Sequence, residues 1–428
     1  MGLIPYDVMN KFGIDDRLIE IAEGTLGDIS DANKSVDKVV FINQAKVIDA
    51  MQKSKLSYNQ FIFATGYGYG DISRDIVDEI YSNVFNTEDA IVRPYFVSGT
   101  HVLSTVLFGL LRPGDELIYA TGSPYDTMRT VIDGRVGEGS LKEYGVLYKE
   151  VPLNKDGTIN IENLIDNITD KTRVIMFQRS RGYSWRPSIG IDMLKAAITS
   201  VKECNNDIVC AVDNCYGEFV EDREPSDAGA DIVAGSLIKN PGAGIAVSGG
   251  YIVGRKDLIE RISYRFTAPG LGKHMGTNFG KSHNILQGLF FAPHVVGQAV
   301  KGAIFLARLF EKLGFGVNPA FDIKRTDIVQ AVKMGDPKKL ISFCQGIQKS
   351  SPIDSFVRPE PWDMPGYDDK IIMSSGGFID GSSIELSADA PLRDPYILYV
   401  QGGVTFEHYI IGALMAVQNM IDENLIVL

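Results

Sequence analysis

The feature that most constrains the fold is the alternation of short apolar runs with longer amphipathic segments between residues 76 and 253. The strand-like runs occupy residues 91–97, 116–119, 173–178, 208–213, 232–234 and 251–253. Helix-like segments lie between several of them, for example residues 76–85, 101–111 and 191–203. Strands that alternate with helices favour a mostly parallel sheet covered by helices on both faces. We therefore predict an α/β fold.

Two of these apolar runs lead directly into charged residues. Asp213 ends the run of residues 208–213, and Lys239 follows the mostly apolar residues 232–238. A turn aspartate and a surface lysine are the plainer interpretations, but ligands in α/β sheets lie beyond the carboxyl ends of strands. A carboxylate and an amine at such ends suit pyridoxal 5'-phosphate (PLP): Lys239 would form a Schiff base with the cofactor, and Asp213 would hold the pyridine nitrogen protonated. Shielding from water would lower the pKa of Lys239, which favours this bond.

Other residues near strand ends suit the remaining parts of the cofactor. Ser98, Gly99 and Thr100 precede an apolar helical run, where free backbone N–H groups bind phosphate well. The same residues also suit an ordinary helix N-cap. Ser236, three residues before Lys239, would add a hydroxyl to the phosphate site. Tyr125 follows the strand-like residues 116–119 and would stack on the cofactor ring or deliver a proton, although a loop tyrosine is more often only packed.

Arginines beyond a third strand end suit an anionic substrate group. Arg179, Arg181 and Arg186 follow the run that ends at residue 178, and a carboxylate is a natural partner for such a cluster. The alternative is a solvated basic loop. Arg393, just before the strand-like residues 397–400, is a second candidate for binding a substrate carboxylate.

Composition narrows the class of protein further. The net charge of −12 argues against nucleic acid as a partner, because phosphate contacts need clustered Lys and Arg. None of the four cysteines forms a CxxC pair, and we expect no metal site; Cys215 either fills the core or lines the site near Asp213. The first residues lack the pattern of a signal peptide, and apolar segments such as residues 410–417 are too short to span a bilayer. We expect a cytoplasmic protein without membrane contact.

The chain divides by pattern into three parts. Residues 1–58 read as an N-terminal helical segment, residues 59–295 as a large cofactor-binding domain, and residues 296–428 as a small α+β domain. In the last part residues 328–332 and 397–400 are strand-like, and residues 296–313, 338–347 and 406–421 are helix-like. Residues 357–369 indicate an irregular loop. Glycine and tyrosine alternate over residues 66–70, which indicates a loop that exposes Tyr67 and Tyr69.

These motifs together resemble those of a known family. Residues 66–71, 98–101, 178–188, 212–218, 235–244 and 392–403 are similar to segments of fold-type I PLP enzymes in the cystathionine and methionine lyase superfamily, and more closely of the bacterial aluminium resistance (methionine gamma-lyase-like) group. The resemblance implies that Lys239 binds PLP covalently and that Asp213 pairs with the pyridine nitrogen. It implies that Gly99, Thr100 and Ser236 hold the phosphate.

The same resemblance implies roles for loop residues and an assembly. Tyr125 would stack on the cofactor ring, and Arg393 would bind the substrate carboxylate. Tyr67 or Tyr69 would reach the phosphate of a neighbouring subunit, because such sites form at a dimer interface. The implied assembly is a homodimer or a homotetramer made of two dimers.

The sequence departs from the better-known lyases at two places. Ile238 stands where they have a hydroxyl residue before the lysine, and the arginine-rich residues 180–186 replace an Asn-Pro segment beside the cofactor. Arg181 and Arg186 would therefore favour a substrate with an extra acidic group. We expect a PLP-dependent carbon–sulfur lyase acting on a sulfur amino acid. The alternatives are another PLP-dependent reaction, such as that of an aminotransferase, a racemase or an aldolase, and a non-catalytic PLP-binding protein.

Overall fold

The chain folds into two units, which we describe separately. The computed structural model describes residues 2–364 and 367–428. The large unit comprises residues 42–182 and 188–292, and the small unit comprises residues 1–41, 183–187 and 293–428. The sequence prediction treated residues 1–58 as a segment of their own, whereas residues 1–41 belong to the small unit and residues 42–58 to the large unit.

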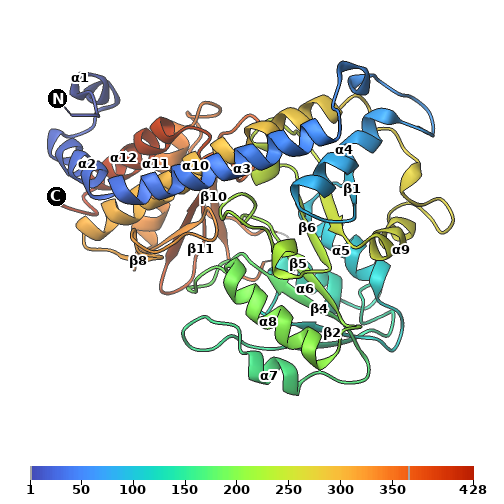
Figure 1. Ribbon diagram of the computed structural model, residues 1–428. Coiled ribbons are helices and arrows are strands. Elements are labelled where there is room, and N and C mark those ends of the chain that lie inside the picture. The colour runs from blue at the N-terminus through green and yellow to red at the C-terminus, as the bar shows by residue number, and fades with distance from the viewer. Residues whose placement is uncertain (1, 365–366) are drawn as a thin grey trace. The chain divides into compact units, whose positions relative to one another are not determined.

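A seven-stranded sheet forms the centre of the large unit (Figure 1). In spatial order its strands are β1 (Asp89–Arg93), β7 (Gly250–Gly254), β6 (Ile232–Ser236), β5 (Val209–Asp213), β4 (Thr172–Gln178), β2 (Glu116–Tyr119) and β3 (Leu147–Glu150). The five strands from β6 to β3 are parallel, and only β7 runs antiparallel to its neighbours. This is the mostly parallel sheet that the alternating pattern predicts.

Helices cover both faces of this sheet. Those of the large unit are α4 (Ile72–Val84), α5 (Gly99–Leu110), α6 (Asp126–Asp133), α7 (Ile161–Asp166), α8 (Ile191–Cys204) and α9 (Lys256–Phe266). Short 3-10 helices are η2 (Tyr58–Phe61), η3 (Pro225–Ala228), η4 (Asn240–Gly242) and η5 (Gly272–His274). Two long helices, α3 (Ser30–Lys53) and α10 (Ser282–Lys312), contribute residues to both units.

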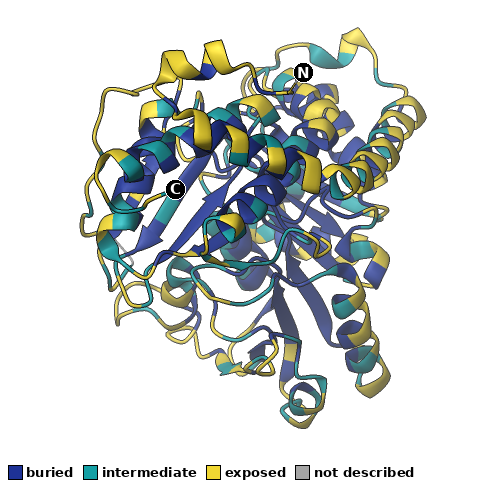
Figure 2. Cartoon of the chain, turned by 90° about the vertical axis from the view of Figure 1, so that its left-hand side faces the viewer, coloured by how far each residue is buried: buried dark blue, intermediate teal, exposed yellow. Residues whose placement is uncertain are grey.

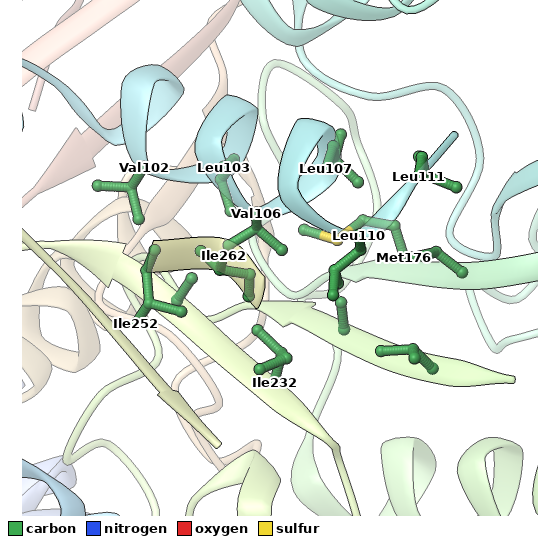
Figure 3. Close-up of a cluster of buried hydrophobic side chains, with 14 of the residues drawn as sticks. Val102, Leu103, Val106, Leu107, Leu110, Leu111, Met176, Ile232, Ile252 and Ile262 are labelled. Atoms are coloured by element: carbon green, nitrogen blue, oxygen red, sulfur yellow. The ribbon is translucent and has the colours of Figure 1, made fainter. Parts of the chain in front are cut away.

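Alternating side chains of the strands build two cores, one on each face. Val174 and Met176 of β4 belong to a cluster with α5, α6 and α9, whereas Ile175 and Phe177 of the same strand belong to a cluster with α7 and α8. Figure 3 shows the first cluster, in which Val102, Val106 and Leu110 of α5 face the sheet. Successive strand residues point to opposite faces, so a central strand must be apolar throughout. This explains why β4, β5 and β6 were recognisable as continuous apolar runs.

Gly109 sets the distance between α5 and α9. A methyl group added at this position would lie 2.8 Å from Ile262 Cα and 3.1 Å from Ile262 Cγ1. We expect Gly109→Ala to lower the free energy of unfolding by about 1–3 kcal/mol, because one helix must move. Urea-induced unfolding followed by circular dichroism measures this loss, with Ser104→Ala on the same helix as the control. Equal midpoints for wild type and Gly109→Ala would contradict the tight crossing.

The small unit contains an antiparallel sheet and helices packed against it. Its strands, in spatial order, are β10 (Ile371–Ser375), β11 (Ser387–Pro391), β12 (Ile397–Gln401), β9 (Gln330–Lys333) and β8 (Gly316–Asn318). Its other helices are α1 (Tyr6–Met9), η1 (Asn10–Phe12), α2 (Asp16–Asp28), α11 (Pro337–Ser350) and α12 (Phe406–Asp422). A methyl group at Gly346 of α11 would lie 2.4 Å from Ala416 Cα of α12, which shows how closely these two helices cross. The predicted small α+β domain is confirmed.

Burial separates core from surface in each unit in the expected way. Figure 2 shows buried residues along the strands and exposed residues on the outward faces of the helices.

One helix, α10, is long and apolar enough to cross a membrane by length and composition alone. The prediction that the apolar segments are too short to span a bilayer does not hold for this helix. In the structure 72% of its most apolar window is buried.

Candidate active site

The candidate site lies at the carboxyl ends of β5 and β6 in the large unit. The two strands are parallel, and Asp213 pairs with Ala234 in their register, so both chains leave the sheet at the same edge. Asp213 is the last residue of β5 and is only 2% exposed. Lys239 follows three residues after the end of β6 and is the N-cap of η4. The sheet therefore brings together the carboxylate and the amine that the sequence singled out.

The Lys239 amine contacts an aromatic ring instead of an acid. Its Nζ lies 4.1 Å from the centroid of the Tyr216 ring. Among residues 2–364 and 367–428 it makes no ion pair and no hydrogen bond. A buried amine without a carboxylate partner is costly in a purely structural role. Such an amine suits a residue that bonds covalently to a carbonyl group.

The electrostatic environment of Lys239 differs from what the sequence suggested. Burial lowers the pKa of the amine, but the acidic groups of Cys215, Tyr216, Asp213 and Tyr125 together outweigh burial and raise this pKa well above its ordinary value. The expectation of a lowered pKa is therefore wrong for the chain without a cofactor, because it considered shielding alone and not the acids that surround the amine. The ammonium form is the one that the cofactor-free site stabilises.

Asp213 is poised to accept a proton or pair with a cation. Its Oδ1 accepts a hydrogen bond of 3.1 Å from the backbone N–H of Cys215. Burial raises the pKa of the Asp213 carboxyl, and the neighbouring Lys239 partly offsets this rise. A buried carboxylate is stabilised by a positive charge placed against it, which a protonated pyridine nitrogen supplies. Cys215, for which the sequence left two interpretations open, is buried and lies in this site.

The residues predicted to hold phosphate come together at the start of α5. Ser98 is the N-cap, and its Oγ accepts from His101 N at 3.1 Å, so the capping interpretation is correct for this residue. A methyl group added at Gly99 would lie 3.7 Å from Ser236 Cβ and 3.9 Å from Cys215 Sγ. The helix N-terminus thus faces Ser236 at the end of β6, and together they form a cradle suited to a phosphate group.

Tyr125 lies next to this cradle. Its hydroxyl is 3.3 Å from Thr100 Oγ1, which is also 2.8 Å from Thr127 Oγ1. The backbone N–H of Tyr125 donates to Gln178 Oε1 at 3.2 Å, which fixes the loop before α6. Burial raises the pKa of the Tyr125 phenol, and the nearby Asp213 raises it further. The phenol is therefore protonated and able to donate a proton.

The arginines of residues 179–186 belong to different units of the chain. Arg179 is fully buried and makes structural contacts: Nε donates to Ile189 O at 3.0 Å, Nη1 to Asn214 Oδ1 at 2.7 Å, and Nη2 to Glu221 Oε2 at 2.7 Å. Arg181 is buried in the large unit. Its position differs from that of Arg186, which belongs to the small unit.

Arg186 and Arg393 both belong to the small unit. Arg186 donates to Pro187 O at 2.9 Å. The Arg393 guanidinium forms an ion pair of 3.1 Å with Asp369 and donates to Tyr183 O at 3.1 Å. The side chain of Arg393 is 53% exposed, so it remains accessible within its unit. Their assignment to the substrate carboxylate stays a prediction.

The glycine-tyrosine loop is exposed but firmly held. Tyr67 and Tyr69 are 74% and 69% exposed. Arg74 Nη1 donates to the carbonyl oxygens of Gly68 and Gly276 at 2.7 and 2.9 Å, and Gly276 N donates to Tyr67 O at 2.7 Å. The left-handed backbone of Gly68 (φ +61°) and its close approach to Gly276 both require glycine. The loop thus presents two ordered tyrosines outward, as the sequence predicts.

Two further residues of the site, the buried Glu218 and the half-buried Tyr216, were not predicted. Glu218 is fully buried, accepts a hydrogen bond of 2.8 Å from the Tyr251 hydroxyl, and has its pKa raised by burial to about 8. Tyr216 lies under the Lys239 amine in a left-handed conformation (φ 71°). The sequence contained these residues in the segment that carries the resemblance, but no spacing or periodicity marks a contact formed between two strand-end loops.

Comparison with known proteins agrees with this architecture. The sequence matches the methionine gamma-lyase family over residues 18–421. It is 50% identical over 401 residues to the uncharacterised protein YnbB of Bacillus subtilis (strain 168), across 93% of this chain and 95% of that protein. A carbon-sulfur lyase involved in aluminum resistance from Clostridium novyi NT has a similar crystal structure, with 48% identity, a TM-score of 0.94 and coverage of 97% of this chain and 98% of that chain.

More distant structures show the breadth of the fold. The pyridoxal-5'-phosphate dependent protein YhfS from Escherichia coli has a TM-score of 0.59 at 16% identity, across 90% of this chain and 97% of that chain. The architecture is that of the fold-type I PLP-dependent enzymes. Within that class the chain belongs to the methionine gamma-lyase family, as the resemblance indicated.

Proposed function

We propose that this protein is a PLP-dependent carbon–sulfur lyase that eliminates a thiol from a sulfur amino acid of the cystathionine or methionine type. The products would be a keto acid and ammonia. Membership of the methionine gamma-lyase family supports this proposal, as does the similarity to the carbon-sulfur lyase of Clostridium novyi. The observation that carries it is the unpaired Lys239 amine at the end of β6, beside the buried Asp213 at the end of β5.

The residues of the large unit fit PLP. The N-terminus of α5 at Gly99 and Thr100, together with Ser236, would hold the phosphate, and Ser98 would fix the first helical turn. Asp213 would pair with the pyridine nitrogen. When bound, the cofactor supplies an electron sink that stabilises negative charge at the substrate Cα.

The chain's own groups would move the protons. The Lys239 amine, once released by the incoming amino acid, would take the proton from the substrate Cα as general base. The ring of Tyr125 would stack on the cofactor ring, or its protonated hydroxyl would give a proton to the departing sulfur. Cleavage of the carbon–sulfur bond then releases the thiol, and hydrolysis of the enamine product yields keto acid and ammonia.

Arginines would recognise the substrate. We propose that Arg393 binds the α-carboxylate and that Arg181 and Arg186 select substrates with an extra acidic group. Arg393→Ala is expected to raise KM about 10- to 100-fold, because a charged hydrogen bond contributes roughly 1.5–3 kcal/mol. Steady-state kinetics measures this, with the exposed Arg358→Ala in the same unit as control. Unchanged substrate preference in both Arg181→Ala and Arg186→Ala would contradict the selective role.

A second copy of the chain would complete each site. We propose that Tyr67 or Tyr69 contacts the cofactor phosphate of a neighbouring subunit in a homodimer or a homotetramer. Mixing Lys239→Ala with a Tyr67→Ala/Tyr69→Ala variant is then expected to give hybrid dimers with one intact site, and activity above that of either variant. Size-exclusion chromatography verifies the hybrids. Hybrid dimers that stay inactive would show that the tyrosines serve their own subunit, and a Tyr67→Ala/Tyr69→Ala variant that is fully active by itself would show that they serve no site.

Product analysis tests the proposed reaction. Purified protein with added PLP is incubated with L-cystathionine, L-methionine and L-cysteine, and keto acid, ammonia and free thiol are quantified. Equal amounts of keto acid and thiol are expected for at least one substrate. Transfer of the amino group to an acceptor would instead identify an aminotransferase, inverted substrate a racemase, and carbon–carbon cleavage an aldolase. Cofactor binding without any turnover would identify a non-catalytic PLP-binding protein.

A further inference from the structure

Tyr216 occupies an unusual backbone conformation directly below the amine of Lys239. Its φ of 71° lies in the left-handed region, which residues with a Cβ adopt only when their surroundings enforce it. In this conformation the centroid of the Tyr216 ring lies 4.1 Å from Lys239 Nζ, with the amine over the ring face. In the described parts of the chain no carboxylate forms an ion pair with this ammonium group. An aromatic face attracts a cation most strongly where water is excluded.

Buried contacts hold the loop that carries Tyr216. Gly217 N donates to Asn214 O at 2.9 Å, and the Arg179 guanidinium donates to Asn214 Oδ1 at 2.7 Å. A methyl group at Gly217 would lie 2.3 Å from Arg179 Nη1, so this arginine lies against the turn. The neighbouring Asn240 Nδ2 donates to Glu218 O at 3.0 Å and ties the lysine loop to the tyrosine loop. The distance between ring and amine is therefore set by the fold.

We propose that Tyr216 is a positioning residue whose ring face holds the Lys239 ammonium group in the site whenever the amine is not bonded to the cofactor. The part this plays in turnover rests on the proposed lyase function. The ring would keep the released amine at the reacting edge instead of letting it pair with Asp213. The ring face makes this contact and the phenol hydroxyl does not, so a ring without the hydroxyl should hold the ammonium group equally well.

Other ionisable groups also face Lys239 and must stay constant in a test. Asp213 ends β5, Cys215 and Glu218 follow in the next loop, and Tyr125 precedes α6. Substitutions at Tyr216 leave all four in place. Tyr216→Phe keeps the ring face, whereas Tyr216→Gly and Tyr216→Asn remove it and tolerate the left-handed conformation. These three variants separate loss of the ring from loss of the fold.

Competitive acetylation of the cofactor-free protein, read by peptide mass spectrometry between pH 7 and pH 11, measures the reactivity of each lysine. Lys239 is expected to react about tenfold faster near neutral pH in Tyr216→Gly and Tyr216→Asn than in wild type, because loss of the ring destabilises the ammonium form and lowers the pKa of the amine. Tyr216→Phe should match wild type. The exposed Lys195 on α8 is the internal reference and should not change.

Each outcome bears on the proposal. Equal reactivity of Lys239 in wild type and the three variants would overturn the proposal. A Tyr216→Phe variant that behaves like Tyr216→Gly would assign the effect to the hydroxyl, which would also overturn the proposal. Circular dichroism confirms that each variant is folded before labelling. The labelling needs no turnover, so a chain that lacks lyase activity would still report on this contact. Failure of the proposed function and failure of this inference are thus distinguishable.

Discussion

Lys239→Ala is expected to abolish both turnover and covalent attachment of PLP. The amine that bonds to the cofactor also serves as general base, and removal of a positioned base alone costs about 10²- to 10⁴-fold in rate. We expect kcat to fall by at least about 10³-fold and the visible absorption band of the bound cofactor to disappear. Because the amine makes no ion pair in the described chain, the substitution should leave folding intact.

Steady-state assay of keto acid and absorption spectroscopy check this expectation together. The matched control is Lys195→Ala, which removes an exposed lysine from the same unit and should leave both readouts unchanged. A Lys239→Ala protein with full activity and an unaltered visible band would remove Lys239 from the site. Added small amines should restore part of the lost rate, because they replace the base without replacing the covalent link.

Asp213→Asn is expected to give the second-largest effect, with a different signature. The amide is nearly the same size and still accepts from Cys215 N, but it lacks the charge that keeps the pyridine nitrogen protonated. Loss of one preorganised electrostatic partner typically costs 10²- to 10³-fold in kcat, so we expect about that loss. Covalent cofactor binding should persist, because Lys239 is untouched.

Rapid mixing and steady-state kinetics measure the Asp213→Asn variant. Asp207→Asn, an exposed acid just before β5, is the control and should behave like wild type. If Asp213→Asn kept kcat within a few-fold of wild type while the cofactor remained bound, the carboxylate would not be the partner of the ring nitrogen. The pair of substitutions thus separates attachment of the cofactor from activation of its ring.

The central strands were predictable because burial on both faces forces an apolar sequence. β5 and β6 stand out for this reason, and the predicted limits of β2 agree with the structure. The prediction missed four strands. Three of them, β3, β8 and β10, lie at sheet edges, and β3 carries Tyr148, Lys149 and Glu150. The fourth, β11, lies between β10 and β12 and ends in Pro391. Edge positions tolerate polar residues, so the sequences of β3, β8 and β10 lack a continuous apolar run. The inner strand β11 was missed because its residues are small or polar and it ends in a proline.

Helix α10 shows a second limit of prediction from sequence, which concerns where a helix begins. The structure starts it at Ser282, whereas the prediction placed its start near residue 296. Pro293 lies inside this helix, although proline removes a backbone donor and is usually found near helix ends. Only the contacts of the folded chain show that the helix continues through it. Local sequence signals therefore give the existence of a long helix more reliably than its ends.

The candidate site was predictable to the extent that it depends on strand ends. Asp213, Ser236 and Lys239 follow from the rule that ligands lie at the carboxyl edge of the sheet. The contact of Tyr216 with Lys239 did not follow, because it depends on a left-handed residue held by a distant arginine. The raised pKa of Lys239 was missed for the same reason, since it arises from neighbours in space.

The most direct test of the account is to locate the cofactor on the chain. Purified protein is incubated with PLP, reduced with sodium borohydride, digested and mapped by mass spectrometry. The account predicts a single modified peptide that carries the reduced cofactor on Lys239, and its loss when the substrate amino acid is added before reduction. Modification of another lysine, or of many surface lysines equally, would contradict the central claim that Lys239 is the residue that binds the cofactor.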